Sequence, residues 1–120
     1  MPSQRDDCLF CGLVREGDHV AQTKGFVAVK DINPAAPVHL LVIPEQHVDS
    51  FREVGEFSAR ESKRMLEFVA ETAQEAGLVD YKVQVNVGPS AGQTIFHLHW
   101  HVLGDPRHGT QPETTAVSEL

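Results

Sequence analysis

The sequence predicts an α+β domain in which an antiparallel sheet packs against one long helix. Short apolar or alternating runs, which are typical of strands, occur before and after the only long stretch with helical periodicity. The links between these runs are too short for the crossovers that parallel strands require, which favours antiparallel pairing. With 120 residues, 41% of them apolar and 22% charged, the chain can bury one hydrophobic core.

The N-terminal region is predicted to contain a short helical turn that carries two cysteines. Cys8 and Cys11 are spaced C-x2-C, which fits half of a zinc site, a redox pair or two small buried residues. Residues 1–7 lack the apolar core of a signal peptide, and no run of eighteen apolar residues occurs. We therefore expect a cytoplasmic protein with no membrane partner, and in that compartment no structural disulfide.

A hairpin, a loop and a central strand are predicted next. The runs 19–23 and 26–30 are interrupted by a Lys-Gly pair, which indicates a hairpin. The two prolines of segment 31–37 lack the amide that a central strand needs, so this segment is predicted to be a loop. The run 39–43 is apolar after its first residue and is followed by a proline, as expected of a strand covered on both faces.

Two helix starts are predicted after this strand. Ser50 with Glu53, and Ser58 with Glu61, each fit the capping box, in which the two side chains satisfy free amides of the first turn. The first helix is expected to be very short. The second has apolar residues at intervals of three and four, and Gly77 can end it in the left-handed conformation. Its sheet-facing residues are predicted to be Met65, Leu66, Phe68, Val69, Ala73 and Ala76.

Two alternating runs complete the predicted sheet. Residues 82–86 alternate as a half-buried strand should, and residues 97–103 alternate histidine with apolar side chains. In a strand, this second alternation places His97, His99 and His101 on one face and the apolar side chains on the other.

Three imidazoles on one strand face have two chemical interpretations. Alternate residues of a strand lie about 6–7 Å apart, so the histidines can touch different parts of one phosphate ester. Three neutral imidazoles can also bind a catalytic zinc that keeps a position for water. Taken alone, this stretch leaves both possibilities open.

The charge of the chain limits its partners. A formal net charge of −7 argues against binding to nucleic acid, because the phosphate backbone is bound mainly through Lys and Arg. A single nucleotide needs only a few local donors, which backbone amides and imidazoles can supply. The segment 105–120 is polar and contains prolines and glycine, so we expect it to be a tail outside a domain that spans residues 1–104.

Residues 97–103 resemble the His-φ-His-φ-His-φ-φ motif of the histidine triad (HIT) superfamily at every position. Residues 92–94 are similar to the segment that precedes the triad in the Hint-like branch, and the resemblance extends upstream through residues 85–86, 39–47 and 31–32. It implies a five-stranded antiparallel sheet with one helix packed on it. It also implies a homodimer in which two sheets form one continuous ten-stranded surface.

The resemblance implies an enzyme that hydrolyses purine nucleoside 5′-phosphoramidates, which are AMP or GMP derivatives, through a nucleotidyl-histidine intermediate. His99 matches the nucleophile, whose tautomer a backbone carbonyl fixes in the family. His101 and Thr94 match the donors expected to protonate the leaving amine, and Thr94 stands where this branch commonly has serine. The residues matched to nucleotide binding are Asp31, Ile32, Asn86, Gly92, Gln93, Thr94, His99 and His101.

The resemblance also gives the cysteine pair a role in a structural zinc site. The four matching ligands form a closed Cys2His2 set, which leaves two triad histidines available for catalysis. His19, His39 and His108 match no functional position, and we expect His39 to be structural. The matched zinc ligands are Cys8, Cys11, His47 and His97.

Three other functions remain open at this point. A dinucleoside polyphosphate hydrolase or a nucleotidyltransferase would share the covalent intermediate and differ in what leaves or receives the nucleotide. A non-catalytic nucleotide- or zinc-binding regulatory module would share the site without turnover.

Overall fold

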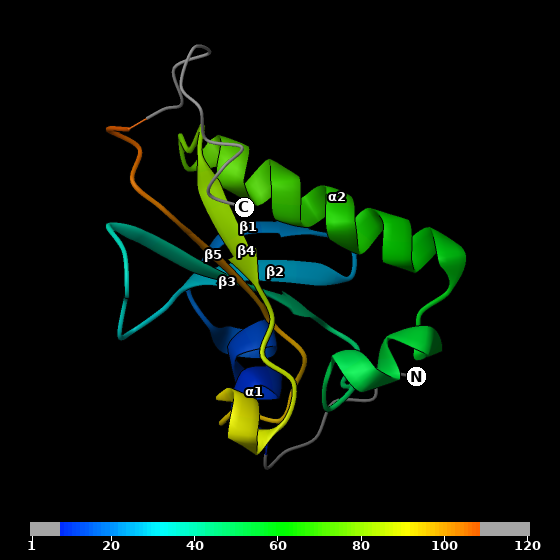
Figure 1. Ribbon diagram of the computed structural model, residues 1–120. Helices are drawn as coiled ribbons and strands as arrows, with labels where there is room; N and C mark the ends of the chain where they lie inside the picture. The colour runs from blue at the N-terminus through cyan, green and yellow to red at the C-terminus, as the bar shows by residue number, and fades with distance from the viewer. Residues whose placement is uncertain (1–7, 109–120) are drawn as a thin grey trace, which may run out of the picture.

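The computed structural model describes residues 8–108, and these form an antiparallel sheet with a helix on each side (Figure 1). Neighbouring strands are all antiparallel, in the order β1-β2-β3-β5-β4. The predicted α+β class with a five-stranded sheet is confirmed. The strands are β1 (His19–Thr23), β2 (Phe26–Lys30), β3 (Val38–Pro44), β4 (Tyr81–Gln84) and β5 (Trp100–Gly104).

The helices begin where the sequence predicts. Both capping boxes form, at the start of the short 3-10 helix η1 (Phe51–Glu56) and of the long helix α2 (Ala59–Glu75). The predicted helical turn with the cysteines is the two-turn helix α1 (Leu9–Glu16), and a second 3-10 helix, η2 (Pro89–Ala91), follows β4.

The sheet-facing side of α2 differs from the prediction at two positions. Leu66 is 56% exposed, whereas Thr72 is buried on the sheet side. Met65, Phe68, Val69 and Ala73 are buried as expected. The apolar stripe is therefore narrower than the sequence pattern indicates.

The sheet separates two apolar clusters. The larger one contains residues of α2 together with Leu40 and Val42 of β3 and Trp100 of β5. The smaller one contains Phe10 of α1 together with Leu41 of β3. Since side chains alternate along a strand, the histidines of β3 and β5 lie on the α1 side.

The histidine stretch enters the sheet later than predicted. The ladder to β3 begins at Trp100, and residues 97–99 precede the strand. Leu98 instead donates its amide hydrogen to the carbonyl of Val48, in the segment that follows β3. The alternation is nevertheless confirmed, because Leu98 and Trp100 both enter the α2-side cluster.

Strand β4 also differs from the prediction. It begins at Tyr81 and ends at Gln84, and all four of its residues are exposed rather than half-buried. The cause is its place at the edge of the sheet, where β5 is its only partner among the described strands.

The predicted tail falls mostly outside the described residues. Within the described part, Asp105 accepts hydrogen bonds from Arg107 just after β5. Residues 109–120, like residues 1–7, lie outside it. Between residues 8 and 108, no helix is both long and apolar enough to cross a membrane.

Candidate active site and metal centre

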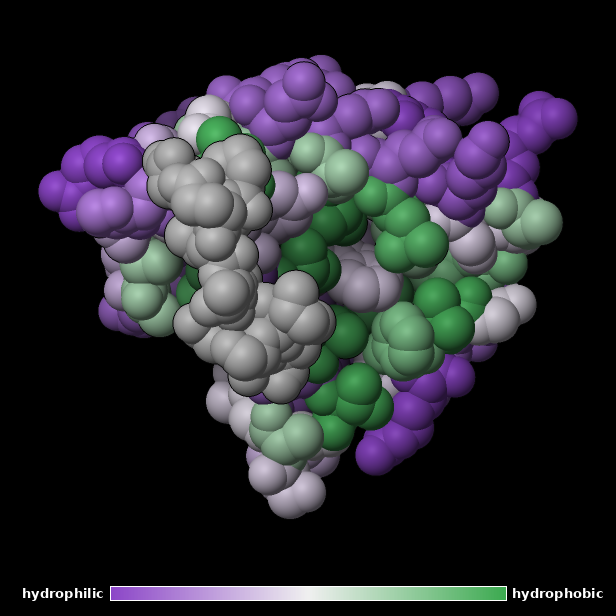
Figure 2. All heavy atoms as spheres, turned by 45° about the horizontal axis from the view of Figure 1, so that its top comes forward, coloured by the Kyte–Doolittle hydropathy of each residue, from purple (hydrophilic) through white to green (hydrophobic). Residues whose placement is uncertain are grey.

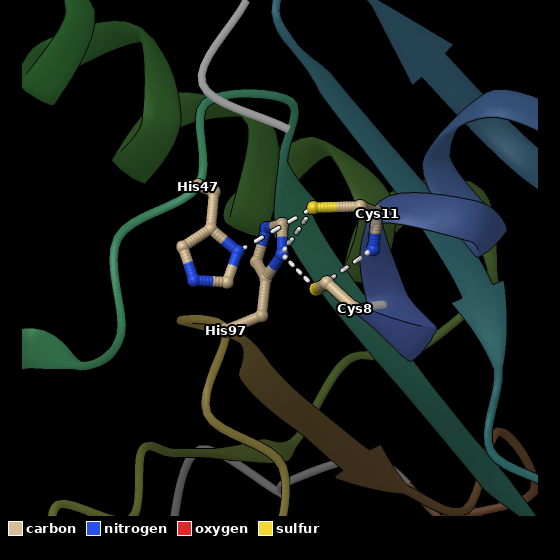
Figure 3. Close-up of side chains that lie close together, drawn as sticks. All are labelled: Cys8, Cys11, His47 and His97. Atoms are coloured by element: carbon tan, nitrogen blue, oxygen red, sulfur yellow. Dashed lines mark hydrogen bonds between the residues drawn. The ribbon is translucent and has the colours of Figure 1, made fainter. Parts of the chain in front are cut away.

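Two thiols and two imidazoles meet beside the N-terminus of α1 (Figure 3). The Sγ atom of Cys8 lies 3.3 Å from Nδ1 of His97, and the Sγ atom of Cys11 lies 3.4 Å from Nδ1 of His47. All four ligand atoms lie within 4.8 Å of one another. A tetrahedral zinc with its usual bonds to sulfur and nitrogen places its ligand atoms about 3.5 Å apart. The four residues therefore fit a structural zinc ion.

The outer ring nitrogens support the same conclusion. Nε2 of His97 donates to the carbonyl of Pro44 at 2.8 Å, and Nε2 of His47 donates to Oδ1 of Asp49 at 2.9 Å. These bonds place both protons on Nε2 and leave the Nδ1 lone pairs facing the thiols, as metal ligation requires. Burial lowers the pKa of His97 to about 4, against the opposing effect of the Pro44 carbonyl, so this ring is neutral at neutral pH.

The middle histidine of the triad has one ring nitrogen held by the backbone. Nδ1 of His99 donates to the carbonyl of His97 at 2.7 Å. Nε2 therefore carries the lone pair. Burial is the main reason that the pKa of His99 is lowered, which keeps that lone pair unprotonated. The ring of Phe10 meets the His99 ring edge-on at a centroid distance of 4.9 Å.

The last triad histidine belongs to a hydrogen-bonded chain. Nδ1 of His39 accepts from the amide of Ala35 at 3.0 Å, which places the His39 proton on Nε2. That nitrogen lies 2.9 Å from Nδ1 of His101 and 3.3 Å from Oδ2 of Asp31. His101 consequently accepts at Nδ1 and, when neutral, carries its own proton on Nε2. Burial lowers the pKa of His101 to about 4, and the neighbouring His99 and His39 contribute in the same direction.

Asp31, His39 and His101 also lie close enough together to hold a metal ion. Ligation through Nε2 of His39 would require that nitrogen to lose its proton while Nδ1 still accepts from Ala35. A neutral imidazole has only one unprotonated nitrogen, so this arrangement disfavours a metal. We assign these three residues to a hydrogen-bonded chain and not to a metal site.

The part that His39 plays could not be predicted from the sequence. In the register between β3 and β5, Leu41 is opposite His101 and Leu103 is opposite His39. The two histidines are therefore diagonal neighbours on one face. The register supplies this information, and no motif in the sequence contains it. Asp49 was not predicted either, although a carboxylate two residues after a metal-ligating histidine is a detectable signal.

The loop that precedes the triad is held by two residues matched to nucleotide binding. The Gln93 side chain is buried, accepts from the amide of Gly88 at 2.9 Å, and donates to the carbonyl of Asp49 at 2.8 Å. Asn86 donates to the carbonyl of Ala91 at 2.7 Å. Gly92 has a φ of 94°, and an added Cβ there would lie 3.3 Å from the Asn86 amide. These side chains shape the loop.

Two other matched residues are placed at the surface. Ile32 is 91% exposed. Thr94 is exposed, and no hydrogen bond joins its hydroxyl to any residue in the described part of the chain. Asp31, by contrast, lies beside His39, and its Oδ1 also accepts from the amide of Asn33 at 2.8 Å.

Known proteins share both the sequence pattern and the fold. The HIT domain pattern matches residues 14–108. Protein HitA of Neisseria gonorrhoeae is 42% identical over 106 residues, which are 84% of this chain and 98% of HitA. A HIT family hydrolase from Clostridium thermocellum superposes with a TM-score of 0.79 at 33% identity, over 91% of this chain and 99% of the hydrolase. A histidine triad protein from Clostridium difficile has a TM-score of 0.74 at 29% identity, over 92% of this chain and 98% of that protein. The chain belongs to the HIT family.

Proposed function

We propose that this protein hydrolyses purine nucleoside 5′-phosphoramidates at the α-phosphorus. The observation that carries the proposal is the arrangement of His99, whose Nδ1 proton is held by the His97 carbonyl at 2.7 Å while burial keeps Nε2 unprotonated. The chain's similarity to a protein named as a HIT family hydrolase supports a hydrolytic reaction.

The reaction proceeds in two steps. Nε2 of His99 forms a bond to the α-phosphorus, and the bond between phosphorus and the amine nitrogen breaks. As the imidazole becomes cationic, its Nδ1–H bond to the His97 carbonyl stabilises the charge. Water then attacks the nucleotidyl-histidine, which releases the nucleoside monophosphate and restores His99.

The hydrogen-bonded chain suits His101 to be a neutral donor. Its Nδ1 faces the proton on Nε2 of His39, so a second proton on the His101 ring would oppose that contact. His101 thus donates a hydrogen bond from Nε2 to the phosphoryl group. The net proton for the departing amine comes from solvent, and the exposed hydroxyl of Thr94 is the candidate to pass it on.

A panel of substrates tests the proposal. Adenosine and guanosine phosphoramidates, a dinucleoside polyphosphate and a sugar nucleotide are assayed for turnover, with nucleoside monophosphate as the measured product. The phosphoramidates are expected to have the highest kcat/KM. Preference for the dinucleoside polyphosphate, or transfer of the nucleotide to a phosphate acceptor, would instead identify one of the sister reactions. Binding without any turnover would identify a regulatory module.

The hydrogen-bonded chain predicts different outcomes for two substitutions of His39. Leucine removes the donor to His101, so we expect His39→Leu to lower kcat by about 10- to 100-fold. Glutamine can place an amide N–H near the same position, so His39→Gln is expected to recover most of that loss. Both variants are compared for kcat and for AMP affinity, which should change little. Equal kcat values in the two variants would contradict the role.

The lowered pKa values of His99 and His101 predict that activity persists at a lower pH than the ordinary pKa of histidine would allow. A pKa below that of ordinary histidine means that the ring binds its proton only at more acidic pH. His101 therefore stays neutral down to about pH 4, although Asp31 opposes this shift, and the pKa of His99 is lowered as well. We expect kcat/KM for a phosphoramidate to stay constant as the pH falls from about 8 through the range in which an ordinary histidine is protonated. Rates corrected for uncatalysed hydrolysis test this, and an apparent pKa near 6.5 would contradict it.

We also propose that Cys8, Cys11, His47 and His97 hold a structural zinc ion. Their closed set of four donors leaves no position for a substrate. The ion would hold the N-terminus of α1 against the residue whose carbonyl orients His99.

An exposed apolar surface supports a homodimer. The residues Phe51, Leu66, Tyr81 and Val83 are all between 40% and 56% exposed. In Figure 2, apolar residues gather in the middle of this face of the molecule, below a band of hydrophilic residues. The indole nitrogen of Trp100 is buried without a hydrogen-bond partner in the described part of the chain. We propose that a second copy covers this surface and extends the sheet at β4.

The dimer proposal predicts that a charge on β4 separates the protomers. Val83→Glu places a carboxylate in the proposed contact, so we expect a monomer of about half the mass of the wild-type species. Val20→Glu is the control, because Val20 is 44% exposed on β1 at the opposite edge of the sheet. Light scattering measures both masses. A wild-type monomer, or a Val83→Glu variant that remains dimeric, would contradict the proposal.

A further inference from the structure

One hollow in the surface lies away from the histidines. It is a pocket of about 640 Å³ between the β1–β2 turn, the residues that follow β3, and the first turns of α2. Its wall includes Phe26 and Phe57, which belong to the apolar cluster on the α2 side of the sheet. His99 and its ring partner Phe10 lie on the other side, where Phe10 belongs to the α1-side cluster. The pocket is therefore separate from the triad.

The size of the pocket and its aromatic wall suit a small organic ligand. Pockets for small molecules commonly measure about 300–1,000 Å³ and combine apolar walls with a few polar groups. Phe26 is 4% exposed and Phe57 is 7% exposed, so both rings are held firmly by the core behind them. Only a small edge of each ring reaches the pocket, and these edges are where an apolar body can make contact.

Positive charge is concentrated at the rim. Lys24, Arg60 and Arg64 line the pocket, although the whole chain has a formal net charge of −7. Arg64 is already bound to Glu71 at 2.8 Å and hydrogen-bonded to Thr23 at 3.4 Å, so it acts as a fixed part of the wall. No ion pair or hydrogen bond occupies the side chains of Lys24 and Arg60 within residues 8–108.

The pocket also has two acidic residues. Glu45 and Glu61 also line it, so, with Arg64 paired to Glu71, the rest of the lining has two basic and two acidic side chains. One oxygen of Glu61 accepts from the amide of Ser58 at 2.8 Å in the capping box, where it favours the first turn of α2. An anion in the pocket would therefore be held by direct pairing with Lys24 and Arg60, and not by a net positive charge of the lining.

We propose that this pocket is a second ligand site, for a small organic anion with an aromatic or apolar body and one acidic group. The body lies against Phe26 and Phe57, and the acidic group pairs with Lys24 and Arg60. The proposal does not depend on the reaction at His99.

The fluorescent aromatic sulfonate 8-anilinonaphthalene-1-sulfonate is the probe for this class of ligand. Titrated into the full-length protein, it is expected to bind at one saturable site per chain, and AMP should not displace it. Lys24→Glu combined with Arg60→Glu should weaken binding at least tenfold. Arg15→Glu combined with Lys63→Glu makes the same change in net charge on exposed positions outside the pocket, and it should leave binding within about twofold.

Several results would overturn the proposal. These are displacement of the probe by AMP, equal weakening in the two double variants, or binding that disappears when Val83→Glu separates a dimer. Circular dichroism checks that the variants fold. If the pocket variant fails to fold, amide chemical shifts of the wild-type protein decide the question. The probe must then perturb residues 23–26 and 60–64, and perturbation confined to other residues would contradict the site.

Discussion

Replacement of His99 by glycine or alanine is expected to abolish phosphoramidate turnover while the protein remains folded and binds AMP. The expected loss in the single-turnover rate is at least about 10⁴-fold, because no covalent intermediate can form without the imidazole. The His99 ring contacts Phe10 and His101 and belongs to neither apolar cluster. Its removal therefore leaves the members of both clusters in place.

The matched control is His108→Ala, which removes an imidazole that is exposed and close to Asp105. This variant should keep the wild-type rate within about twofold. Rapid-quench measurements of AMP release, together with AMP titration, separate chemistry from binding. Turnover by His99→Ala at the wild-type rate would exclude the nucleophile assignment. A loss of AMP binding without a loss of the chemical step would show that His99 contributes to nucleotide binding and not to catalysis.

The features of the fold that could be predicted from the sequence are those with local signals. Capping boxes, the left-handed Gly77 and the alternation around His99 rely on neighbours within a few residues, and the structure confirms all three. The late start of β5 and the exposure of β4 depend on which strands pair and where the sheet ends. No local pattern contains that information.

The candidate site likewise has parts that could be predicted from the sequence and parts that could not. The four residues that could hold a metal were all given by the resemblance, and the structure brings them together. The link from Asp31 through His39 to His101 could not be predicted, because it depends on the register of β3 against β5. Gln93 shows the opposite case, since its position matched a binding role while its side-chain amide is used to hold the loop.

Removal of a zinc ligand is the second change with a large expected effect. Cys11 is fully buried and lies close to both histidines of the metal set. Cys11→Ser should therefore release the ion and lower the free energy of unfolding by at least about 2 kcal/mol, because metal binding contributes directly to folding. Asp49→Asn, which alters only the outer partner of His47, should weaken zinc binding by about 10- to 100-fold and leave the fold intact.

Elemental analysis of protein purified without added metal or a metal-binding tag is expected to find about one zinc per chain. His101→Ala should keep that zinc, since its ring belongs to the chain with His39 and not to the metal set. Two results would contradict the four-ligand site. One is a stably folded, metal-free protein in which both thiols react with a thiol reagent. The other is zinc that is lost on His101→Ala and kept on Cys8→Ser, which would move the ion to the three triad histidines and turn the proposed nucleophile into a ligand.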